Sequence, residues 1–516
     1  MNFRLLFVLV GAALLAGANS TQAELRLASP FTDHAVLQCD KPVPVWGTAS
    51  PGTAVRVSFA GQTKSARADA NGNWRVTLEP LRASAQSRTL AVTGDGGSEA
   101  RRDVLVGEVW LASGQSNMDF SLSKKVKYFA GVANEEQEIA AADYPLIRMF
   151  TGKAAKAYTP QTSVGGEWQV CRPETAPAFS AVAYFFARDL QKEIQVPVGI
   201  VTEAFGASTA EAWIDRAALA GDPKLKPLLD HFDAAVESFR TNPPPAIAPP
   251  RPEDVSATNA APAGRRRGGA PRDPVQDQHN PTVLFNGMIH PIIPFAIRGF
   301  LWYQGESIVG GSAGVALYPH VQAALIRDWR RLWGEGEVPF YIVQLAGQKA
   351  ASNSPLVREA QATVLALPQT GMAVAMDIGE AKNVHPKNKQ DVGDRLARIA
   401  LANVYGRKIE YSGPRYESIN VEGPVLRVKF SHLGGGLVAK GGTPLKWFEL
   451  AGADKKFVAA EARIDGDTVV VSSPAVPAPV AVRYAWENFP EGCNLFNAAG
   501  LPAAQFRSDA PKIPIE

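Results

Sequence analysis

The N-terminal part of the chain, residues 24–105, has the residue pattern of β-strands. Apolar and polar residues alternate over Val55–Phe59 and again over Trp74–Leu78, and the second stretch follows a hairpin turn signal at Asn71-Gly72. Proline and glycine punctuate the remainder. The pattern predicts a small β-sandwich domain over residues 24–105.

The middle part, residues 106–408, alternates short apolar segments with segments of helical period. The predicted strands are Val109–Ala112, Val198–Thr202, Gly299–Tyr303, Phe340–Leu345 and Met372–Met376. The predicted helices are Ser180–Ile194, His320–Trp333 and Gln390–Val404. Apolar strands that alternate with helices are typical of a parallel sheet covered on both faces. We therefore expect an α/β domain over residues 106–408.

The C-terminal part, residues 409–516, shows no helical period. Strand patterns occur at Val425–Phe430 and at Ile464–Val471, where the second stretch contains a turn signal. The pattern predicts a C-terminal β-rich domain.

One tract inside the middle part, residues 242–280, does not fit either pattern. It is rich in proline, alanine and arginine, and it lacks the periodicity that a buried core needs. We expect a disordered insertion on the surface. The three consecutive arginines Arg265–Arg267 could bind an anionic polymer, but a solvated loop is the preferred interpretation.

The N-terminus has the features of a secretory signal peptide. Arg4 is followed by an apolar stretch from Leu5 to Ala16, and Thr21-Gln22-Ala23 has small residues at the positions that signal peptidase reads. The apolar stretch is shorter than the roughly 20 residues of a spanning helix, which disfavours an uncleaved membrane anchor. We expect residues 1–23 to be removed after Ala23 and the mature protein to be secreted or periplasmic.

Length and composition are those of a globular protein with more than one domain. The 516 residues suggest about three domains, and hydrophobic residues make up 46% of the chain. The net charge of +3 gives no reason to expect a nucleic acid or an anionic membrane as partner. The three cysteines, Cys39, Cys171 and Cys493, lack the spacing of a metal site, and we interpret them as small buried residues.

Three sequence blocks carry residues suited to catalysis. In the first, an apolar strand runs into Gly114-Gln115-Ser116, which places a serine hydroxyl at the carboxyl end of a parallel strand. The helix that would follow offers free backbone N–H groups to a developing oxyanion. Met118 stands where a GxSxG nucleophile elbow has its second glycine.

The other two blocks also follow predicted strands. Gln304 and Gly305 come after the strand Gly299–Tyr303, where a glutamine amide can donate hydrogen bonds. His385 follows Met372–Met376, and Pro386 restricts its backbone to an extended conformation. Strands of one parallel sheet would bring these residues to the edge that presents Ser116.

Together these blocks resemble the sialate O-acetylesterase family of the SGNH hydrolase superfamily. The resemblance covers residues from about 25 to the C-terminus except the 242–280 tract. It is carried by Ser113–Met118, Phe205-Gly206, Glu211–Trp213, Asn286–Met288, Trp302–Ser307, His385–Gln390 and Cys493–Asn497. It implies an SGNH-type three-layer αβα hydrolase domain and a carbohydrate esterase that needs no cofactor and no metal.

The resemblance also implies roles for individual residues. Ser116 matches the nucleophile and His385 the histidine that accepts its proton. The oxyanion hole would consist of the backbone N–H groups of Ser116 and Gly206 and the side chain of Gln304. The substrate would contact Gln115, Asn117, Trp213, Asn286 and Glu306. Trp213, Trp302 and Tyr303 could offer a flat surface to a sugar ring, or they could belong to the core.

The third member of a catalytic triad stays open. Relatives carry an aspartate two or three residues before the histidine, but this chain has Asn383 and Lys382 there. Asp377 or Glu380 could orient His385, or a backbone carbonyl could do so and leave a Ser–His dyad. Asp377 is the preferred candidate.

The resemblance implies an O-acetylated sugar as substrate, most directly O-acetylated sialic acid. Acetylated xylan or xyloglucan oligosaccharides are the alternative. Two other classes are weighed against an esterase: a carbohydrate-binding protein without activity and a serine peptidase. The intact Ser116, Gly206, Gln304 and His385 disfavour the first, and the lack of a peptide-binding motif disfavours the second.

Overall fold

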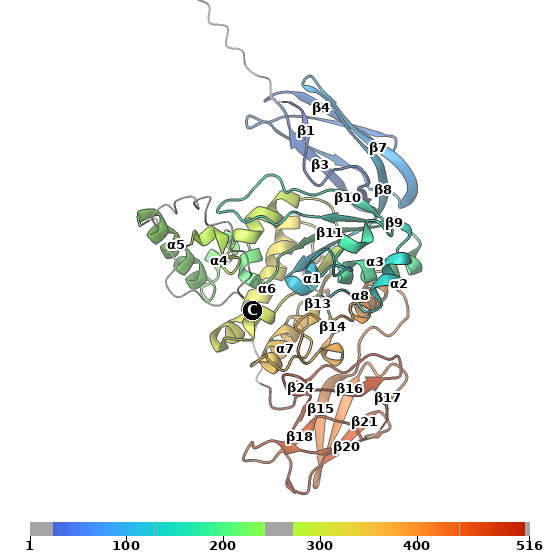
Figure 1. Ribbon diagram of the computed structural model, residues 1–516, viewed down its shortest axis with the longest axis vertical. Helices are drawn as coiled ribbons and strands as arrows, with labels where there is room; N and C mark the ends of the chain where they lie inside the picture. Colours follow the sequence, from blue (N-terminus) through green and yellow to red (C-terminus); the bar gives the residue numbers. More distant parts are fainter. Residues whose placement is uncertain (1–23, 128–129, 243–271, 443, 511–516) are drawn as a thin grey trace, which may run out of the picture.

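The computed structural model describes residues 24–127, 130–242, 272–442 and 444–510 (Figure 1). The N-terminal β-strands lie at one end of an elongated molecule, the helices and the main sheet lie in the middle, and the C-terminal β-strands form the opposite end (Figure 1). The predicted signal peptide and the arginines 265–267 lie outside the described residues.

The N-terminal region contains two sheets. The sheet β1-β3-β6 is antiparallel, and β4 pairs with β5 and β7 in the other. Alternation in β6 turns Trp74, Val76 and Leu78 inward and leaves the residues between them exposed. The strands are β1 (Arg26–Leu27), β2 (Val36–Gln38), β3 (Val43–Thr48), β4 (Ala54–Phe59), β5 (Gln62–Arg67), β6 (Asn73–Leu78) and β7 (Ser84–Gly94).

Strand β8 (Gly97–Gly114) joins this region to the middle of the molecule. Its first half pairs with β7 antiparallel and with β2 in parallel. Its second half, from Glu108 on, pairs in parallel with two strands of the main sheet. The boundary predicted at residues 105 and 106 therefore falls within one continuous strand.

The main sheet has the order β10-β9-β11-β8-β12-β13-β14. All its pairings are parallel except that of the edge strand β10 with β9. The carboxyl ends of β8, β11 and β12 consequently meet at one edge, where parallel sheets form their sites. The further strands are β9 (Tyr144–Thr151), β10 (Trp168–Cys171), β11 (Val198–Ala204), β12 (Gly299–Tyr303), β13 (Phe340–Gln344) and β14 (Thr370–Val374).

Helices cover both faces of this sheet. Successive residues of a strand point to opposite faces, and Trp110 of β8 contacts Phe186 of α3 with ring centroids 5.1 Å apart. Phe300 of β12 pairs with Leu111, the neighbour of Trp110, and its ring contacts Trp329 of α6 at 5.4 Å. The helices α3 (Ala181–Ile194) and α6 (Ser312–Trp333) therefore lie on opposite faces, as a three-layer arrangement requires.

Further helices complete the middle region: α1 (Ser116–Asp119), α2 (Glu135–Ala140), α4 (Arg216–Gly221), α5 (Lys226–Thr241), α7 (Ser354–Ala362) and α8 (Gln390–Asn403). Short helical turns occur at η1 (Ala176–Ala178), η2 (Ala210–Trp213), η4 (Pro274–Gln276), η5 (Phe285–Ile289), η6 (His290–Ile292), η7 (Glu306–Ile308), η8 (Thr363–Ala366) and η9 (Met376–Ile378). Within the described residues no helix has the length and apolar character to span a membrane.

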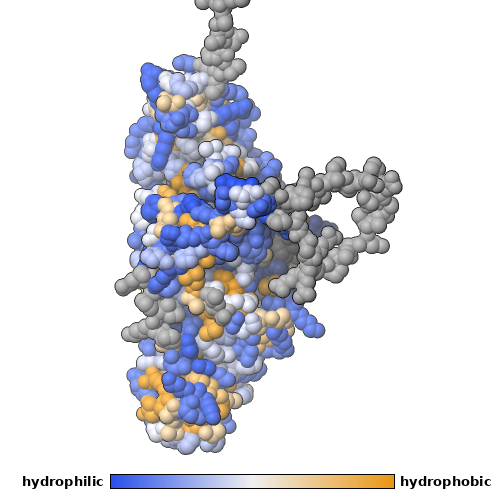
Figure 2. Space-filling model, turned by 90° about the vertical axis from the view of Figure 1, so that its left-hand side faces the viewer, coloured by the Kyte–Doolittle hydropathy of each residue, from blue (hydrophilic) through white to orange (hydrophobic). Residues whose placement is uncertain are grey.

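The C-terminal region is antiparallel β-structure. It has the sheets β15-β16-β21-β20, β17-β23 and β19-β18-β22-β24. The surface of this end has apolar side chains among polar ones (Figure 2). Trp447 and Val480 are exposed apolar residues of this region. The strands are β15 (Arg415–Glu422), β16 (Val425–Ser431), β17 (Leu437–Ala439), β18 (Phe448–Ala451), β19 (Val458–Ala459), β20 (Glu461–Asp465), β21 (Thr468–Ser472), β22 (Ala481–Tyr484), β23 (Leu495–Asn497) and β24 (Phe506–Arg507).

Two sequence predictions need correction. Helix α6 begins at Ser312, eight positions before the predicted start, and it contains Pro319. The tract predicted to be disordered ends earlier than residue 280, because η4 buries Pro274 and Val275 and the Tyr158 hydroxyl bonds to Asp273. Residues 243–271 of that tract lie outside the described residues.

Candidate active site

The Ser116 turn is fixed by close contact between β8 and β12. Gly114 has a φ of +135°, and a Cβ there would lie 2.2 Å from the carbonyl oxygen of Tyr303, so only glycine fits. The backbone N–H of Gln115 donates to that same carbonyl at 2.9 Å. Helix α1 then begins at Ser116, whose side chain is thereby presented at the carboxyl edge of the sheet.

His385 lies in the loop between β14 and α8, and Asn383 determines its backbone position. The Asn383 side chain accepts a hydrogen bond from the His385 N–H at 3.0 Å and donates one to the His385 carbonyl at 2.7 Å. The imidazole Nε2 lies 2.8 Å from the Ser116 Oγ. The structure thus brings together the two residues that the sequence placed 269 positions apart.

The charge state of His385 suits a hydrogen-bond acceptor. Burial, together with the ammonium of Lys389, lowers the pKa of His385 to about 4. A neutral imidazole with its proton on Nδ1 can accept the hydrogen of the Ser116 hydroxyl at Nε2. Such an arrangement is chemically able to serve as a general base and a nucleophile.

A cavity of about 560 Å³ opens beside this pair. Its lining residues come from the carboxyl ends of strands and from the segments that follow them. They are Ser116, Asp119, Lys127, Thr151, Gly152, Ala154, Ala204, Phe205, Gly206, Ala207, Gln278 and His385. The volume is large enough for a sugar ring with an acyl group, since small-molecule sites are about 300–1,000 Å³.

The predicted oxyanion donors Gly206 and Gln304 differ in their position relative to the cavity. Gly206 lies against the serine, because a Cβ at Gly206 would be 3.8 Å from the Ser116 Cβ. Gln304 is fully buried and is not among the residues that line the cavity. Its Nε2 donates to the Ser208 carbonyl at 3.1 Å and its Oε1 accepts from the Tyr318 hydroxyl at 2.8 Å. A glutamine amide has two N–H donors, so Ser208 accounts for one of them.

Both carboxylates considered for the triad have other partners. Asp377 accepts two hydrogen bonds from the Arg395 guanidinium, at 2.6 and 2.7 Å. Glu380 accepts from the Lys387 N–H at 2.7 Å and from the Asn383 side chain at 3.2 Å. Asp377 stays a prediction as the triad acid, and the partner that the structure shows for both of its oxygens is Arg395.

The five predicted substrate contacts are all directed into the protein. Gln115 accepts from the Gly305 N–H at 3.1 Å, and Trp213 donates to the Ser208 hydroxyl at 2.9 Å. Asn286 donates to the carbonyls of residues 157 and 158 at 3.1 and 3.0 Å. Asn117 and Glu306 bond to one another. These side chains stabilise the loops around the cavity, and Trp302 and Tyr303 belong to the core.

Several cavity residues were missed in the sequence. Lys127 and Asp119 form an ion pair at the cavity wall, and burial raises the pKa of the Asp119 carboxyl although Lys127 opposes this. Gln278 belongs to the tract that was predicted to be disordered, and Thr151 ends β9, a strand that was not predicted. Of these residues, Asp119 could have been found from the sequence, because it lies three residues after Ser116.

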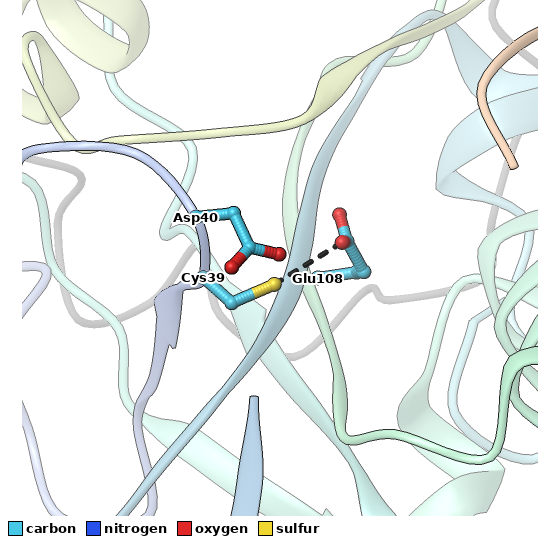
Figure 3. Close-up of side chains that lie close together, drawn as sticks. All are labelled: Cys39, Asp40 and Glu108. Atoms are coloured by element: carbon cyan, nitrogen blue, oxygen red, sulfur yellow. Dashed lines mark hydrogen bonds between the residues drawn. The ribbon is translucent and has the colours of Figure 1, made fainter. Parts of the chain in front are cut away.

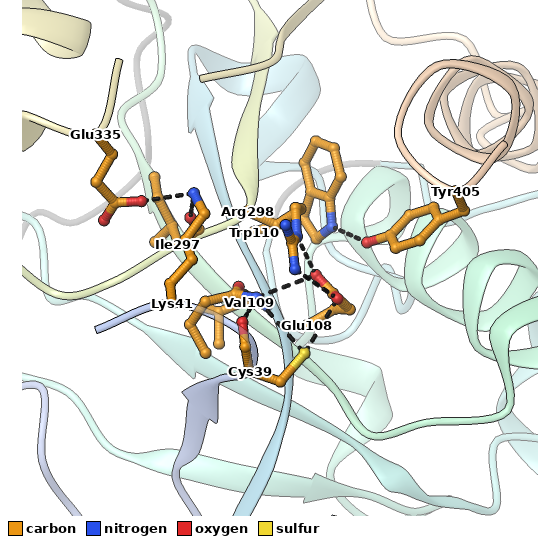
Figure 4. Close-up of polar contacts among 10 residues, drawn as sticks. Cys39, Lys41, Glu108, Val109, Trp110, Ile297, Arg298, Glu335 and Tyr405 are labelled. Atoms are coloured by element: carbon orange, nitrogen blue, oxygen red, sulfur yellow. Dashed lines mark hydrogen bonds and ion pairs between the residues drawn. The ribbon is translucent and has the colours of Figure 1, made fainter. Parts of the chain in front are cut away.

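A second cluster of ligand-type side chains lies away from this cavity. Cys39, Asp40 and Glu108 approach one another between the N-terminal region and β8 (Figure 3). The Arg298 guanidinium donates to both Glu108 oxygens, at 2.6 and 3.0 Å, and the Cys39 thiol also donates to that carboxylate (Figure 4). Burial raises the pKa of the Cys39 thiol. An arginine-neutralised carboxylate beside a protonated thiol does not fit a metal ion.

The contact between Cys39 and Glu108, together with contacts of the neighbouring Lys41, attaches the N-terminal region to the main sheet. Lys41 donates to the Ile297 carbonyl at 2.8 Å and to Glu335 at 2.6 Å (Figure 4). All three cysteines are buried and free of disulfides, as the sequence interpretation expected.

Comparison with known proteins gives a consistent result. Residues 279–402 match the family described as "Carbohydrate esterase, sialic acid-specific acetylesterase". A sialate O-acetylesterase of Rattus norvegicus is 29% identical over 461 residues, which cover 81% of this chain and 80% of the relative. The corresponding enzyme of Homo sapiens is 27% identical over 457 residues, covering 80% and 77%.

Among solved structures, a carbohydrate acetylesterase from Xanthomonas citri is 39% identical and has a TM-score of 0.79. The match covers 94% of this chain and 99% of the other, so it includes the N-terminal and C-terminal β-regions as well as the main sheet. The chain therefore belongs to the sialic acid-specific acetylesterase family of carbohydrate esterases.

Proposed function

We propose that this protein is a serine esterase that removes O-acetyl groups from carbohydrates, with Ser116 as nucleophile and His385 as general base. The observation that carries the proposal is the 2.8 Å contact between the Ser116 Oγ and the His385 Nε2 at the wall of a cavity of sugar size. Family membership supports the same chemistry.

In the proposed reaction, His385 takes the Ser116 proton while the Oγ attacks the acetyl carbonyl carbon. The C=O electron pair moves to oxygen and then re-forms the carbonyl while the bond from the acetyl carbon to the sugar oxygen breaks. The imidazolium protonates that oxygen, so the sugar leaves with a free hydroxyl and the acetyl group stays on Ser116. Water deprotonated by His385 attacks the acetyl-serine, releases acetate and restores the Ser116 hydroxyl. Each proton that His385 takes up is returned within the same half-reaction.

The oxyanion would be held by backbone N–H groups of Ser116 and Gly206. Gly206 supports this role because its backbone adjoins Ser116 without a side chain between them. Gln304 would add its second amide hydrogen, since Ser208 uses only one. Removing one such donor typically lowers turnover by about 10²–10³-fold.

O-acetylated sialic acid is the proposed substrate. The curated relatives that support it act, by their names, as sialate O-acetylesterases. Lys127 is a cavity-lining cation with 32% of its side chain exposed. Its ammonium has three N–H donors, so it can bind the carboxylate of an acidic sugar while it keeps its contact with Asp119.

Acetylated xylan or xyloglucan oligosaccharide is the second candidate. Asp119 already balances the Lys127 charge, and a neutral sugar needs no further cation. The greater identity to a carbohydrate acetylesterase than to the sialate enzymes also keeps this candidate in view.

An acetate-release assay separates these candidates. The purified enzyme would be offered 9-O-acetyl sialic acid, acetylated xylo-oligosaccharide and acetylated xyloglucan, with Ser116→Ala as the inactive control. We expect the highest kcat/KM on the sialate and a selective loss on that substrate in Lys127→Met. Equal activity of Ser116→Ala and wild type would reject the proposed mechanism, and preference for the neutral oligosaccharides would reject the substrate.

Assays of the same purified protein also test the two other functional classes, a carbohydrate-binding protein and a peptidase. Binding of sugars with no release of acetate or of p-nitrophenol from its acetate would favour a carbohydrate-binding protein. Cleavage of peptides but not of acetyl esters would favour a peptidase. Secretion remains our proposal, and N-terminal sequencing of the mature protein should begin near Glu24.

A further inference from the structure

A second cavity lies between the N-terminal region and the main region. Its volume is about 690 Å³, against about 560 Å³ for the cavity beside Ser116, and the two cavities have no lining residue in common. We name it the interdomain cleft. One wall is the sheet β1-β3-β6 with the adjoining residues, and the other consists of residues 161–163 together with residues between 290 and 294.

The register of the sheet places five side chains on the face that borders the cleft. Trp46 of β3 pairs with Arg75 of β6. Thr48, two positions further along β3, pairs with Asn73 of β6 and with Arg26 of β1. Side chains alternate between the two faces along a strand, and directly paired residues share a face. All five residues line the cleft, so this face presents one aromatic ring beside four side chains that form hydrogen bonds.

The Trp46 ring is held in place and still borders the cleft. Its centroid lies 4.9 Å from that of Phe31 and 6.5 Å from that of Phe295, which belongs to the main region, and both contacts are T-shaped. The Trp46 side chain is nevertheless partly exposed. A rigid indole offers a flat apolar surface to the C–H groups of a sugar ring, and it loses little conformational entropy on binding.

The charged groups of the cleft include both signs. The Arg26 guanidinium forms ion pairs with Glu24 at 2.5 Å and with Glu99 at 3.8 Å. Arg75 forms no ion pair within the described part of the chain, and Asp69 is a carboxylate in the same lining. A ligand of one charge sign therefore gains little at these exposed groups. The hydroxyls of an uncharged sugar, in contrast, can accept from the guanidinium and donate to the carboxylate.

One segment of the main region connects the cleft to the cavity beside Ser116. Ala154 lines that cavity, and Gln161, seven positions later, lines the cleft. Seven residues of extended chain span at most about 25 Å, so the two cavities lie within that distance of one another. The Gln161 carbonyl accepts from the His290 Nδ1 at 2.7 Å, which joins the two main-region segments of the cleft wall. A glycan of several sugar units is long enough to span this distance.

We propose that the interdomain cleft is a second carbohydrate-binding site, which takes uncharged sugar units of the glycan that carries the acetyl group. The choice of this ligand rests on the proposed function. Trp46 packs against the face of a sugar ring, and Arg75 and Asn73 form hydrogen bonds with its hydroxyls. A glycan held in the cleft has a raised local concentration of acetyl groups at Ser116.

Isothermal titration calorimetry with glycans that carry no acetyl group tests the site. The glycans are xyloglucan oligosaccharides and a desialylated complex-type N-glycan, which separate a plant source from a glycoprotein source, and the sialylated N-glycan is the anionic comparison. We expect at least one uncharged glycan to bind with a Kd of about 1 mM or tighter. Trp46→Ala should weaken this binding about tenfold or more. Arg75→Ala should weaken it about threefold to tenfold.

Matched controls change the same residue types outside the cleft. Trp447→Ala removes an exposed tryptophan of the C-terminal region. Arg56→Ala removes an exposed arginine of β4 that, like Arg75, has no ion pair within the described residues. Both variants should bind the glycan as wild type does. Trp46→Phe keeps an aromatic face and should bind more tightly than Trp46→Ala, and the urea midpoint of each variant shows that it is folded.

Three results would overturn the proposal. The first is no binding of either uncharged glycan by wild type at about 10 mM. The second is equal binding by wild type and Arg75→Ala, a test that stands even if Trp46→Ala does not fold, because Arg75 is exposed. The third is preferred binding of the sialylated glycan that is lost in about 0.5 M salt, which indicates an anion site.

The acetate-release assay of Ser116→Ala separates this inference from the proposed function. Full activity of Ser116→Ala would reject the proposed function, and glycan binding that depends on Trp46 and Arg75 would still support the cleft. An inactive Ser116→Ala together with no glycan binding by wild type would reject the cleft alone.

Discussion

Asp377→Asn should weaken the fold and leave the chemical step largely intact. Asp377 and Arg395 each have 6% of the side chain exposed and form a bidentate pair at 2.6 and 2.7 Å. Breaking a buried pair costs about 3–5 kcal/mol in the free energy of unfolding. Asparagine keeps one acceptor, and Asp391 lies 3.6 Å from the same guanidinium. Because these groups still compensate part of the Arg395 charge, we expect the free energy of unfolding to fall by about 3 kcal/mol, the lower end of this range.

The assay combines urea unfolding, followed by fluorescence, with kcat/KM at a temperature where the variant is folded. Asp394→Asn is the control, because its pair with Arg398 is partly exposed and of the same carboxylate–guanidinium type; it should cost at most about 0.5 kcal/mol. A triad aspartate would behave in the opposite way, since its loss typically lowers kcat by about 10⁴-fold. Such a loss in Asp377→Asn, with unchanged unfolding, would refute the structural role argued from the Arg395 contacts.

Three further changes test other parts of the structure. Gly114→Ala should lower the free energy of unfolding by about 1–3 kcal/mol in urea titration, because its φ is +135° and its Cβ would lie 2.2 Å from the Tyr303 carbonyl oxygen. Gly206→Ala is the control: the nearest atom to its Cβ would be 3.8 Å away, so the free energy of unfolding should not change. Gln304→Ala should lower kcat by about 10²–10³-fold if its second N–H reaches the oxyanion, and a nearly normal kcat would remove it from that role. Glu203→Gln should stabilise the protein at pH 7 and not at pH 4: the carboxyl is fully buried without a hydrogen-bond partner among the described residues, and burial raises its pKa well above the usual 4.5. As the pH rises, the unfolded chain therefore loses this proton at a lower pH than the folded protein does. The free energy of unfolding of the wild type then falls by about 1.4 kcal/mol per pH unit above pH 4.5. Equal free energies of unfolding for both proteins at all pH values would contradict the argument.

The main sheet could be predicted because its strands are buried on both faces. Such strands are continuous apolar runs, and the predicted Gly299–Tyr303 has the same bounds as β12. Strand β9 was missed because Pro145 and Arg148 interrupt its apolar pattern. Arg148 is nevertheless buried, since it forms an ion pair with Asp103 from the neighbouring region. A contact between distant segments is not visible in a local pattern.

The same limit applies to Asp377, the preferred candidate for the acid behind His385. It lies eight residues before His385 in the sequence, and this spacing does not reveal the partner of its carboxylate. In the structure, helix α8 returns beside the η9 turn and brings Arg395 to the carboxylate. The contact between Asp377 and Arg395 depends on how this later helix packs, which the local sequence does not show.

The predicted substrate residues show a related difficulty. Residues that follow a strand at the carboxyl edge of a sheet must either face the ligand or hold the loops that do. Gln115 is next to Ser116 and yet turns to the Gly305 backbone, whereas Thr151 and Gln278, far away in sequence, line the cavity. Motifs therefore point to Ser116 and His385, which we propose as nucleophile and general base and which lie 2.8 Å apart. Closeness to a motif in the sequence does not separate the residues that contact substrate from those that support the loops. That division depends on which strand ends adjoin β8. The order of the strands is a property of the folded sheet and is not visible in the local sequence.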